Sequence, residues 1–325
     1  MHIVLPGALP DSAPIAAELA KRLPGAAPTL CAWLAAGQAR VRQFDVQMQG
    51  CTPFEAWQLN QAGFQPAPDE PLAAGLGPLR APARPDATGQ AGAPPQPVWI
   101  ADLASVALAT DRASLLPAEW LQISPAEGAA LFEAIQPLLA GSGFDARAVA
   151  PDRWLVDVPP GFALRSASPA AVRGHALSAW WDQQPAARPW RRLLNEIQMV
   201  WHGHDVNDRR LQAGKPPVNG LWLYGGARRW PAPPLSQPAP LVADALRRPA
   251  EDEDWAAWLD AMGHIDRDVL LPLSPGPGKP PLQPARLSLF GRDREAALTL
   301  QPRGLLSRWL PARASDWNSW WSPLA

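Results

Sequence analysis

Several residue types and patterns are rare in this sequence, and each shortage excludes a class of protein. No run of about 18 apolar residues occurs in the 325 positions, so we expect no membrane-spanning helix. The opening MHIVLPGALPDS has no basic region before its short apolar run, unlike a signal peptide. The formal net charge of −1 provides no attraction to nucleic acid or to an anionic membrane. We therefore expect a cytoplasmic protein that has neither nucleic acid nor a membrane as its partner.

Cysteine and tyrosine are also scarce. Only Cys31 and Cys51 are present, and their spacing fits neither a metal-binding motif nor a disulfide framework. We expect two buried thiols in a reducing compartment. Tyrosine occurs once, whereas tryptophan occurs 17 times, and most of these large apolar side chains should pack in a core. The 24 glycines and 41 prolines make up a fifth of the chain, which predicts long, rigid loops between compact elements.

The first third of the chain contains signals for short elements. Residues 2–6 are expected to form a strand, and residues 12–23 a helix with Ser12 as its N-cap. A second helix is predicted over residues 30–44. Thr52 and Glu55 have the spacing of a capping box, which predicts another helix start. Residues 66–97 are rich in proline and glycine and are interpreted as a linker or a loop.

The rest of the chain alternates strands and helices. Residues 98–160 predict a β-β-α-β module, with Ser124 and Glu127 as the capping box of its helix. Helices are then expected at 168–181, 188–204 and 252–273, a buried strand at 220–226, and a terminal hairpin around the polar turn 292–295. The fold class is therefore α/β, and the expected domains are 1–97 (first part of the core plus linker), 98–165 (inserted α+β module) and 166–325 (second part of the core, hairpin and Trp-rich tail).

The stretch HGHDVNDRRLQAGKPPVNGLWLYGG, residues 202–226, concentrates polar groups beside a buried strand. An arginine fork and asparagine amides suit a phosphate or carboxylate. Ligands of α/β sheets commonly lie beyond the carboxyl ends of strands. The candidate ligand-binding residues are His204, Asn207, Arg209, Arg210, Asn219 and Trp222. The alternative is a structural turn, in which the asparagines and glycines serve the backbone and the arginines face solvent.

The order of elements and several of their sequence words resemble the archaeal-type cofactor-independent phosphoglycerate mutases of the alkaline phosphatase superfamily. The most specific matches are His204-Asp205-Val206-Asn207, Arg209 or Arg210, Gly214, Pro217, Asn219 and Trp222-Leu223-Tyr224-Gly225. The module 98–160 resembles the inserted domain of that family, and Ile265 and Asp266 are in register with its later helix. The resemblance covers residues 98–273 and is closer still to a bacterial branch of mutase-like, RpfE-type regulatory proteins. It implies a reduced alkaline-phosphatase-like core with an inserted small α+β module.

The sequence departs from that family where catalysis would need it. Active members hold two metal ions through an Asp near the first strand and through later Asp and His groups. Here the first strand continues into LPGALPD, where Asp11 is the only nearby carboxylate, and no histidine follows His264. A dinuclear site needs about six to eight protein ligands, but the chain contains only five histidines, and their spacing does not suit it. We therefore predict no catalytic residue, no metal ligand and no cofactor.

The preferred interpretation is a catalytically degenerate mutase relative with a regulatory role. Its partners would be a phosphorylated or carboxylated small molecule, or a protein that contacts the Trp-rich surface. The alternative is an active 2,3-bisphosphoglycerate-independent phosphoglycerate mutase. A DNA-binding regulator is the third hypothesis, but neither a basic face nor a helix-turn-helix pattern supports it. Ser124 and Thr52 are interpreted as helix caps and not as nucleophiles, the acidic run 251–254 as a helix start, and the C-terminal tryptophans as packing on the core.

Overall fold

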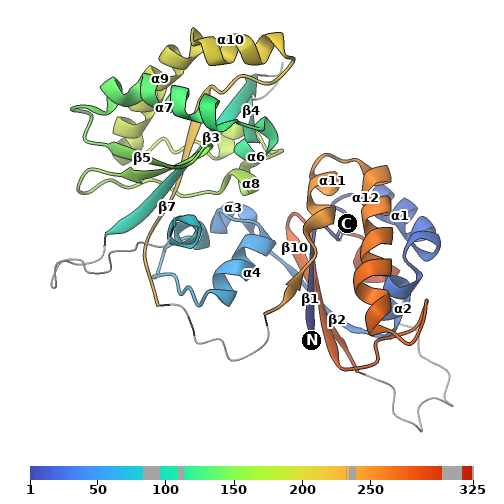
Figure 1. The fold of residues 1–325 in the computed structure, drawn as a ribbon. Helices are drawn as coiled ribbons and strands as arrows, with labels where there is room; N and C mark the ends of the chain where they lie inside the picture. Colours follow the sequence, from blue (N-terminus) through green and yellow to red (C-terminus); the bar gives the residue numbers. More distant parts are fainter. Residues whose placement is uncertain (83–95, 109–112, 232, 234–238, 302–316, 324–325) are drawn as a thin grey trace. The chain divides into compact units, whose positions relative to one another are not determined.

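The computed structural model describes residues 1–82, 96–108, 113–231, 233, 239–301 and 317–323. The chain forms two compact units: unit 1 contains residues 1–45 and 234–325, and unit 2 contains residues 46–233. Unit 1 is therefore built from both ends of the chain, and unit 2 from its middle (Figure 1).

Unit 1 contains a five-stranded mixed sheet in the order β2-β10-β9-β1-β8. β1 lies parallel to both β8 and β9, whereas β10 lies antiparallel to β9 and β2. The carboxyl ends of β1, β8 and β9 therefore meet at one edge of the sheet. The strands are β1 (His2–Pro6), β2 (Gln38–Gln43), β8 (Leu241–Val242), β9 (Ala285–Phe290) and β10 (Arg294–Leu300).

Helices cover one face of this sheet, as Figure 1 shows for α1, α2 and α12. Alternate residues of each strand point to that face, so Ile3, Leu287 and Leu298 join the same buried cluster. Trp33 and Trp258 fill the layer between the sheet and the helices. The helices of unit 1 are α1 (Ala13–Ala26), α2 (Pro28–Ala36), α11 (Arg247–Glu251), α12 (Trp255–Ile265) and α13 (Asn318–Trp321). A π-helical turn, Asp266–Leu270, continues α12.

Unit 2 contains an antiparallel sheet in which β3 is central. β3 pairs with β7 along one edge and with β6 and β4 in succession along the other. β5 continues the sheet beyond β6. The strands are β3 (Pro97–Leu108), β4 (Ala113–Pro117), β5 (Asp145–Ala150), β6 (Arg153–Asp157) and β7 (Gly220–Arg228).

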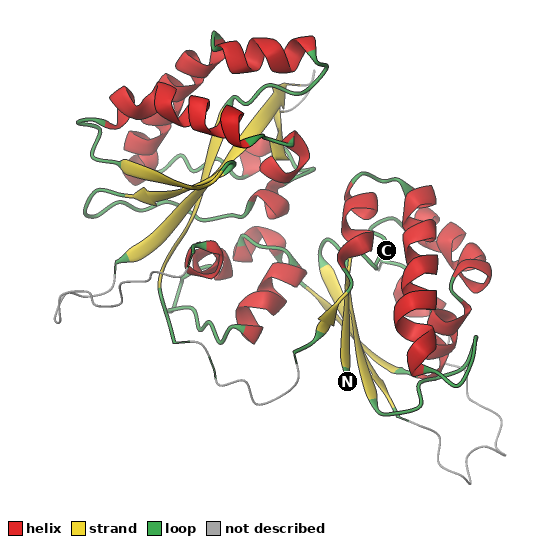
Figure 2. Cartoon of the chain, in the orientation of Figure 1, coloured by secondary structure: helices red, strands yellow, loops and turns green. Residues whose placement is uncertain are grey.

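The core of unit 2 is formed by the sheet together with α7 (Pro125–Leu139) and α9 (Arg188–His202) (Figures 1 and 2). Trp154 and Trp201 meet edge to face in this core, with ring centroids 5.9 Å apart. The other helices of unit 2 are α3 (Val46–Gln49), α4 (Pro53–Gln61), α5 (Leu76–Arg80), α6 (Ala118–Leu121), α8 (Pro169–Val172) and α10 (Asp205–Gln212). The predicted α/β class is confirmed, as one mixed sheet and a separate antiparallel sheet.

The predicted N-cap residues Ser12, Thr52 and Ser124 precede α1, α4 and α7, although the Ser12 side chain makes no cap hydrogen bond. Both capping boxes are present: the Thr52 and Ser124 hydroxyls accept from the backbone N–H of Glu55 and Glu127, and each glutamate accepts from its cap residue. Asp254, the last residue of the acidic run, caps α12 by accepting from the Ala257 N–H at 3.0 Å. These signals are local, so the sequence contains them in full.

Three predicted elements are wrong in part. The helix expected over residues 30–44 ends at Ala36, because Gly37 is followed by β2, which pairs with β10. Residues 168–181 form α8 and a 3-10 turn instead of one helix. The expected pair of strands in 97–111 is one long strand, β3, paired on both edges. In the first and third cases, pairing with a distant strand decides the outcome.

The stretch 66–97, interpreted as a linker or loop, is in part a packed segment. Residues 72–80 form a 3-10 turn and α5, and Leu76 is fully buried. Residues 83–95 of this stretch lie outside the described part of the chain. The boundaries predicted at 97/98 and 165/166 differ from those of the two compact units, because β7 and α9, from beyond residue 165, complete the core around β3. The three-domain division stays a prediction.

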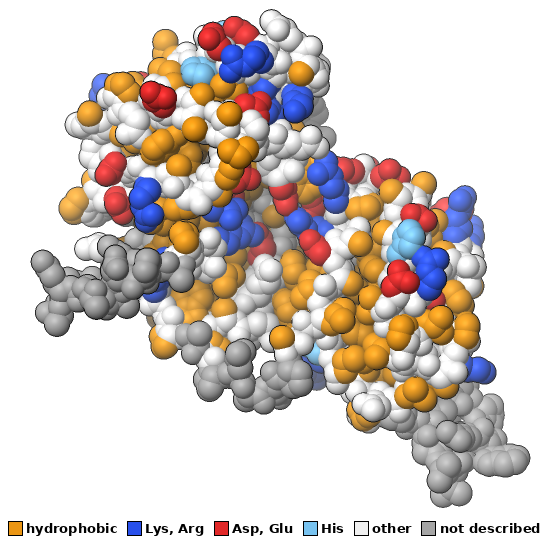
Figure 3. Space-filling view, in the orientation of Figure 1, with side chains coloured by type: hydrophobic (Ala, Val, Ile, Leu, Met, Phe, Trp, Pro, Cys, Tyr) orange, Lys and Arg blue, Asp and Glu red, His pale blue; other side chains and the backbone are white. Residues whose placement is uncertain are grey.

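Charged side chains of both signs are interspersed on the face seen in Figure 3, as the near-zero net charge leads one to expect. Among the residues that the structure places, none of the helices has the length and apolar content needed to cross a bilayer.

Candidate functional site

The predicted ligand segment connects α9 to β7 in unit 2. His202 is the last residue of α9, and His204 caps the next helix, α10. The His204 Nδ1 accepts a hydrogen bond from the Val206 N–H at 3.2 Å, which is the usual task of an N-cap side chain. The chain turns at Gly203 between the two histidines, so they belong to different helices and not to the single predicted one.

Asn207 connects α10 to the chain that leads into β7. Its amide nitrogen donates to the carbonyls of Trp201 and Val218 at 2.7 and 2.8 Å, and its Oδ1 accepts from the Val218 N–H at 2.7 Å. The side chain is 3% exposed. Each amide atom therefore has a backbone partner, and Asn207 holds the turn together.

The two neighbouring arginines differ in their surroundings, since Arg210 is buried and Arg209 is exposed. Arg210 is 1% exposed and donates to the carbonyls of Pro216 and Leu121 and to the Glu127 carboxylate, at 2.8, 2.6 and 3.0 Å. Arg209 is exposed, and no partner for its guanidinium is found within the described part of the chain. Successive residues of a helix lie about 100° apart, so the two cannot form one fork toward a ligand.

Asn219 and Trp222 also have partners within the protein. The Asn219 amide exchanges two hydrogen bonds with the backbone of Val106, at 2.6 and 3.0 Å, and so extends the β3–β7 pairing. The Trp222 indole N–H donates to the Ala167 carbonyl at 2.8 Å. The structure thus brings the segment together as a folded unit, in which Arg209 and Lys215 are the exposed cations. As a ligand site the six residues stay a prediction.

A buried polar network that the sequence analysis missed crosses the same sheet. Arg153 of β6 donates through Nε and Nη2 to both carboxylate oxygens of Asp102 on β3, at 2.7 and 3.0 Å. The Tyr224 hydroxyl of β7 donates to Asp102 at 2.8 Å. That hydroxyl also accepts from Arg80 of α5, at 2.9 Å. Tyr224 therefore joins β7 to β3 and α5, and Asp102 joins β3 to β6.

The network continues into the cap of α4. Arg80 forms an ion pair with Glu55, which also accepts from the Ser168 hydroxyl at 2.6 Å. Two arginines and two carboxylates balance in charge, so the network has an internal partner for every ion. Glu55 therefore has two tasks, since it closes the capping box of α4 and pairs with α5.

Burial shapes the acid–base properties of this network. Burial raises the pKa of the Tyr224 phenol above its usual range, and the Asp102 carboxylate adds to this effect while Arg80 opposes it. Burial acts to lower the pKa of Arg80, but the Tyr224 oxygen and the carboxylates of Glu55 and Asp102 outweigh it and raise that pKa. At neutral pH the network therefore contains two charged arginines and a neutral phenol.

The network depends on a close approach that only glycine permits. A Cβ on Gly77 of α5 would lie 2.0 Å from the Val98 carbonyl oxygen and 3.0 Å from the Cα of Gly225 on β7. Gly225 has φ +102°, and its own Cβ would lie 2.8 Å from the Cα of Gly77. These glycines let α5 contact the sheet and bring Arg80 to Tyr224. In the sequence, Gly77 and Arg80 fall within the supposed linker, which explains why the network was missed.

In unit 1 the place where the family resemblance implies a metal-binding carboxylate is the carboxyl end of β1. Pro6 ends that strand, and Gly7 follows with φ +76°. The Gly7 carbonyl accepts the Trp258 indole N–H at 2.8 Å. Trp258 in turn meets Trp321 of α13 edge to face, with centroids 6.2 Å apart. Tryptophan side chains therefore pack at this end of the strand.

Arg294 fixes the last helix near that same end of β1. It is 1% exposed and donates to the carbonyls of Pro10, Trp321 and Ser322, at 2.6, 2.8 and 2.7 Å. Burial lowers the pKa of this guanidinium. The predicted packing of the C-terminal tryptophans is confirmed for Trp317, Trp320 and Trp321, which contact the core of unit 1. Residues 302–316 lie outside the described part.

The described residues do not fit a dinuclear metal centre. Asp11 is partly exposed and pairs with Arg292 at 3.5 Å, and His264 faces Asp260 on the outer side of α12 at 3.7 Å. Within the described ranges, no group of three or more His, Cys, Asp or Glu side chains is arranged to hold a metal ion.

Comparison with known proteins gives a distant relation. No family model matches the chain. Over 123 residues it is 30% identical to a probable 2,3-bisphosphoglycerate-independent phosphoglycerate mutase of Geobacter sulfurreducens. The match covers 37% of this chain and 31% of that relative, so it spans about a third of the relative's length. The sequence therefore has a distant relation to the cofactor-independent phosphoglycerate mutases.

Two solved structures resemble the chain at low scores. One is the cofactor-independent phosphoglycerate mutase of Thermoplasma acidophilum, with a TM-score of 0.33 and 14% identity over 100% of this chain and 95% of that one. The other is the Pyrococcus horikoshii protein PH0037, with a TM-score of 0.33 and 11% identity over 92% and 87% of the two chains. The relation to the mutases therefore rests on the sequence match.

Proposed function

We propose that this protein is a catalytically degenerate relative of the metal-dependent phosphoglycerate mutases and acts as a binding protein in a regulatory role. The observation that carries the proposal is the carboxyl end of β1. Pro6 and Gly7 stand where a metal-binding aspartate would be needed, and the indole of Trp258 bonds the Gly7 carbonyl. Neither proline nor glycine has a side-chain metal ligand, and the edge-to-face indoles of Trp258 and Trp321 add apolar bulk there.

The carboxylates near the carboxyl end of β1 give further support. Phosphoryl transfer through two metals needs several carboxylates and imidazoles converging on ions about 3.5–4 Å apart. The carboxylates nearby have other partners: Asp11 pairs with Arg292, and Asp244 pairs with Arg247 at 3.2 Å. These are exposed ion pairs between side chains and not a converging ligand set.

An anionic small molecule is the ligand that we propose, with a protein partner as the alternative. The curated relative is named for phosphoglycerate, so a phosphorylated three-carbon acid is the first class to test. Of the predicted donors, Arg209 is exposed beside the fixed turn of Asn207, whereas Arg210 is committed to Glu127 and to two backbone carbonyls. Arg209 is therefore the residue through which such an anion would be held.

The test uses the full chain. Metal analysis after gel filtration and a mutase assay with added manganese should show neither bound metal nor turnover. Two retained metal equivalents with turnover would instead support an active mutase. A thermal-shift series with 3-phosphoglycerate, 2-phosphoglycerate and citrate should find stabilisation of about 2.7 kcal/mol at 100 times the dissociation constant. For a chain of this size that corresponds to a rise of several degrees, at roughly 2–4 °C per kcal/mol.

The matched variants are Arg209→Ala and Arg192→Ala. Both arginines are exposed on helices of unit 2, and Arg192 pairs with Glu196 on its own helix, at 3.1 Å. We expect Arg209→Ala to abolish the ligand-induced shift and Arg192→Ala to leave it intact. If none of these anions stabilises the protein, the small-molecule part of the proposal is wrong, and a protein partner would have to account for binding.

A further inference from the structure

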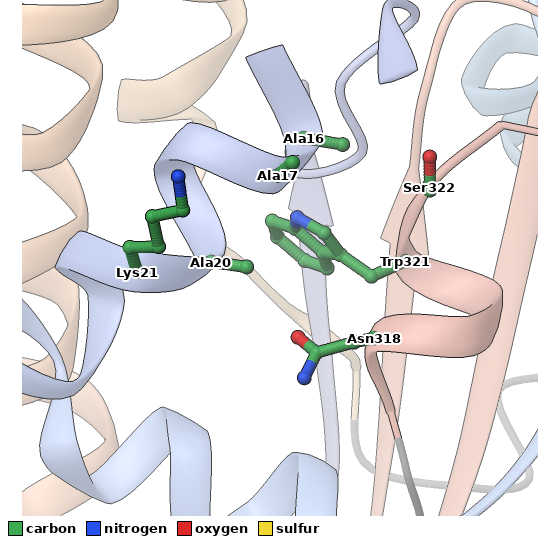
Figure 4. A pocket seen from close by; sticks show the side chains of 7 residues that line it. All are labelled: Ala16, Ala17, Ala20, Lys21, Asn318, Trp321 and Ser322. Atoms are coloured by element: carbon green, nitrogen blue, oxygen red, sulfur yellow. The ribbon is translucent and has the colours of Figure 1, made fainter. Parts of the chain in front are cut away.

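The hollow between α1 and α13 in unit 1 offers a ligand few directed contacts (Figure 4). Alanine side chains of α1 line it, Lys21 and Asn318 are exposed, and Trp321 is packed to 1% exposure. The outer edge of the sheet in the same unit offers more, because a row of backbone donors and acceptors lies along it.

This outer edge is β2, which pairs on its inner side with β10. The Phe44 N–H donates to the Asp293 carbonyl at 2.7 Å, which fixes the phase of the antiparallel ladder. Because hydrogen-bonded pairs alternate along such a ladder, the even-numbered residues of β2 bond to β10. The odd-numbered residues, Ala39, Val41 and Gln43, therefore direct their backbone N–H and C=O groups outward. Within the part of the chain that the structure describes, no strand pairs with β2 on that side.

The devices that usually prevent pairing at a sheet edge are a very short strand, a proline, a bulge or a covering element. β8, at the opposite edge of this sheet, has two residues and follows Pro240. β5, an outer strand in unit 2, has a register shift between Ala148 and Ala150. β2 has six residues, no proline and an unbroken register, and all of its residues except Val41 are exposed. It is therefore open to the addition of a strand.

The charge on β2 selects among partners. Arg40 and Arg42 project from the same face, as alternate residues of a strand do. Arg42 is 71% exposed and pairs with Glu295 of β10 at 3.3 Å, whereas Arg40 lies opposite Ala297 and has no ion-pair partner among the described residues. A second copy of β2 that paired antiparallel over the whole strand would place arginine opposite arginine, which is destabilising. Acidic side chains at the same positions would be stabilising.

We infer that β2 binds an extended segment of another protein, in which acidic and apolar residues alternate, as an added antiparallel strand. The acidic side chains would face Arg40 and Arg42, and the apolar ones would extend the surface of Val41, which packs against the core of unit 1. Main-chain hydrogen bonds give such a complex its affinity, and alternate side chains give it specificity. The inference is independent of the proposed anion site, because β2 is in unit 1 and Arg209 is in unit 2.

The first test uses the full chain and short fluorescent peptides in which glutamate and valine alternate. In fluorescence anisotropy titrations, such a peptide should bind at least tenfold more tightly than a lysine–valine peptide of the same length. In the antiparallel complex the valines lie opposite the outward-facing residues of β2, so their N–H groups make the hydrogen bonds. N-methylation of the valines should therefore abolish binding, and N-methylation of the glutamates should change it less than threefold. Equal effects of the two methylations would overturn strand addition.

The second test changes the edge itself. Val41→Pro removes an N–H that points outward and is not part of the ladder with β10, and proline is tolerated at such positions of edge strands. Val41→Ala is the matched control, because it loses side-chain packing but keeps the N–H. We expect Val41→Pro to weaken binding of the glutamate–valine peptide at least tenfold and Val41→Ala to weaken it less than threefold. Circular dichroism verifies that each variant is folded.

The role of charge has its own matched pair, Arg40→Glu and Arg22→Glu. Both reverse an exposed cation of unit 1, but Arg22 is on α1, where it pairs with Glu18 at 2.9 Å. Arg40→Glu should weaken the glutamate–valine peptide several-fold and strengthen the lysine–valine peptide, whereas Arg22→Glu should affect neither. The inference is overturned if the glutamate–valine peptide does not bind the wild type, or if the two charge variants behave alike.

Discussion

The carboxylate of Asp266 accepts a hydrogen bond from the backbone N–H of Leu30 at 2.6 Å, across 236 positions of the sequence. The second oxygen accepts from the Thr29 N–H at 3.3 Å. The N-cap residue of α2 is Ala27, which has no side-chain acceptor, so Asp266 supplies the cap from the π-helical turn that follows α12. Asp266 therefore ties the two halves of unit 1 together.

Replacing Asp266 by Ala should lower the free energy of unfolding by about 1–2 kcal/mol, the usual cost of losing an N-cap. The orphaned N–H groups of α2 would remain buried. Asp268→Ala is the control, because Asp268 is on the same turn but exposed, facing Arg267 at 3.4 Å. Urea unfolding of the two variants measures the difference. Equal stabilities would show that the contact contributes nothing.

The two arginines of α10 should differ sharply in their effect on stability. Arg210→Ala removes three hydrogen bonds from a fully buried guanidinium and leaves two carbonyls without a donor, so we expect a loss of about 2–4 kcal/mol. Arg209→Ala should change the stability by less than about 0.5 kcal/mol, as for most exposed positions. Chemical denaturation checks both values. A stable Arg210→Ala variant would contradict the structural assignment.

Tyr224 should resist ionisation for as long as the protein is folded. Its pKa is raised above the usual value of about 10 by burial, so it contributes stability that is complete below that pH and lost as pH rises through the folded-state pKa. Because the chain has a single tyrosine, tyrosinate absorbance reports on this residue alone. We expect that absorbance to appear only together with unfolding in an alkaline titration.

The variant Tyr224→Phe separates the hydroxyl from the ring. It removes the donor to Asp102 and the acceptor of Arg80, so a loss of about 1–3 kcal/mol at neutral pH is expected. If tyrosinate forms reversibly near pH 10 in the folded wild type, the phenol is not buried in the network as described.

His2 should make unit 1 less stable in mild acid. Burial, Arg286 and the N-terminal amine lower its pKa to about 4, and its Nε2 shares a 2.9 Å hydrogen bond with the Ser288 hydroxyl. A lowered pKa favours the neutral imidazole, so its contribution is present above about pH 6.5 and lost as pH falls toward 4. Because the ring is only partly buried, we expect a loss of about 1 kcal/mol at pH 5.

His2→Gln keeps a hydrogen-bonding side chain and removes the titration. Its unfolding free energy should therefore fall less between pH 7 and pH 5 than that of the wild type. NMR titration of the His2 ring measures the pKa directly. A value near 6.5 would contradict the prediction.

Features that depend on neighbouring residues could be predicted from the sequence. Each capping box, at Thr52 and at Ser124, involves only four consecutive residues, and both form in the structure. The strand at 2–6, the buried strand beginning at Gly220 and the terminal hairpin follow from apolar residues bounded by turn residues. The sequence also showed that Pro6 and Gly7, and no carboxylate, directly follow the apolar residues of the first strand.

Which polar side chains contact one another depends on how distant elements pack. Arg80, Asp102 and Tyr224 are far apart in the chain and come together because β3 pairs with β7 and glycines let α5 contact both. Arg210 points inward to Glu127, 83 positions away, and no local pattern separates it from Arg209. Local propensity fixes the start of an element, but the direction in which a side chain points depends on which distant strand or helix packs against it.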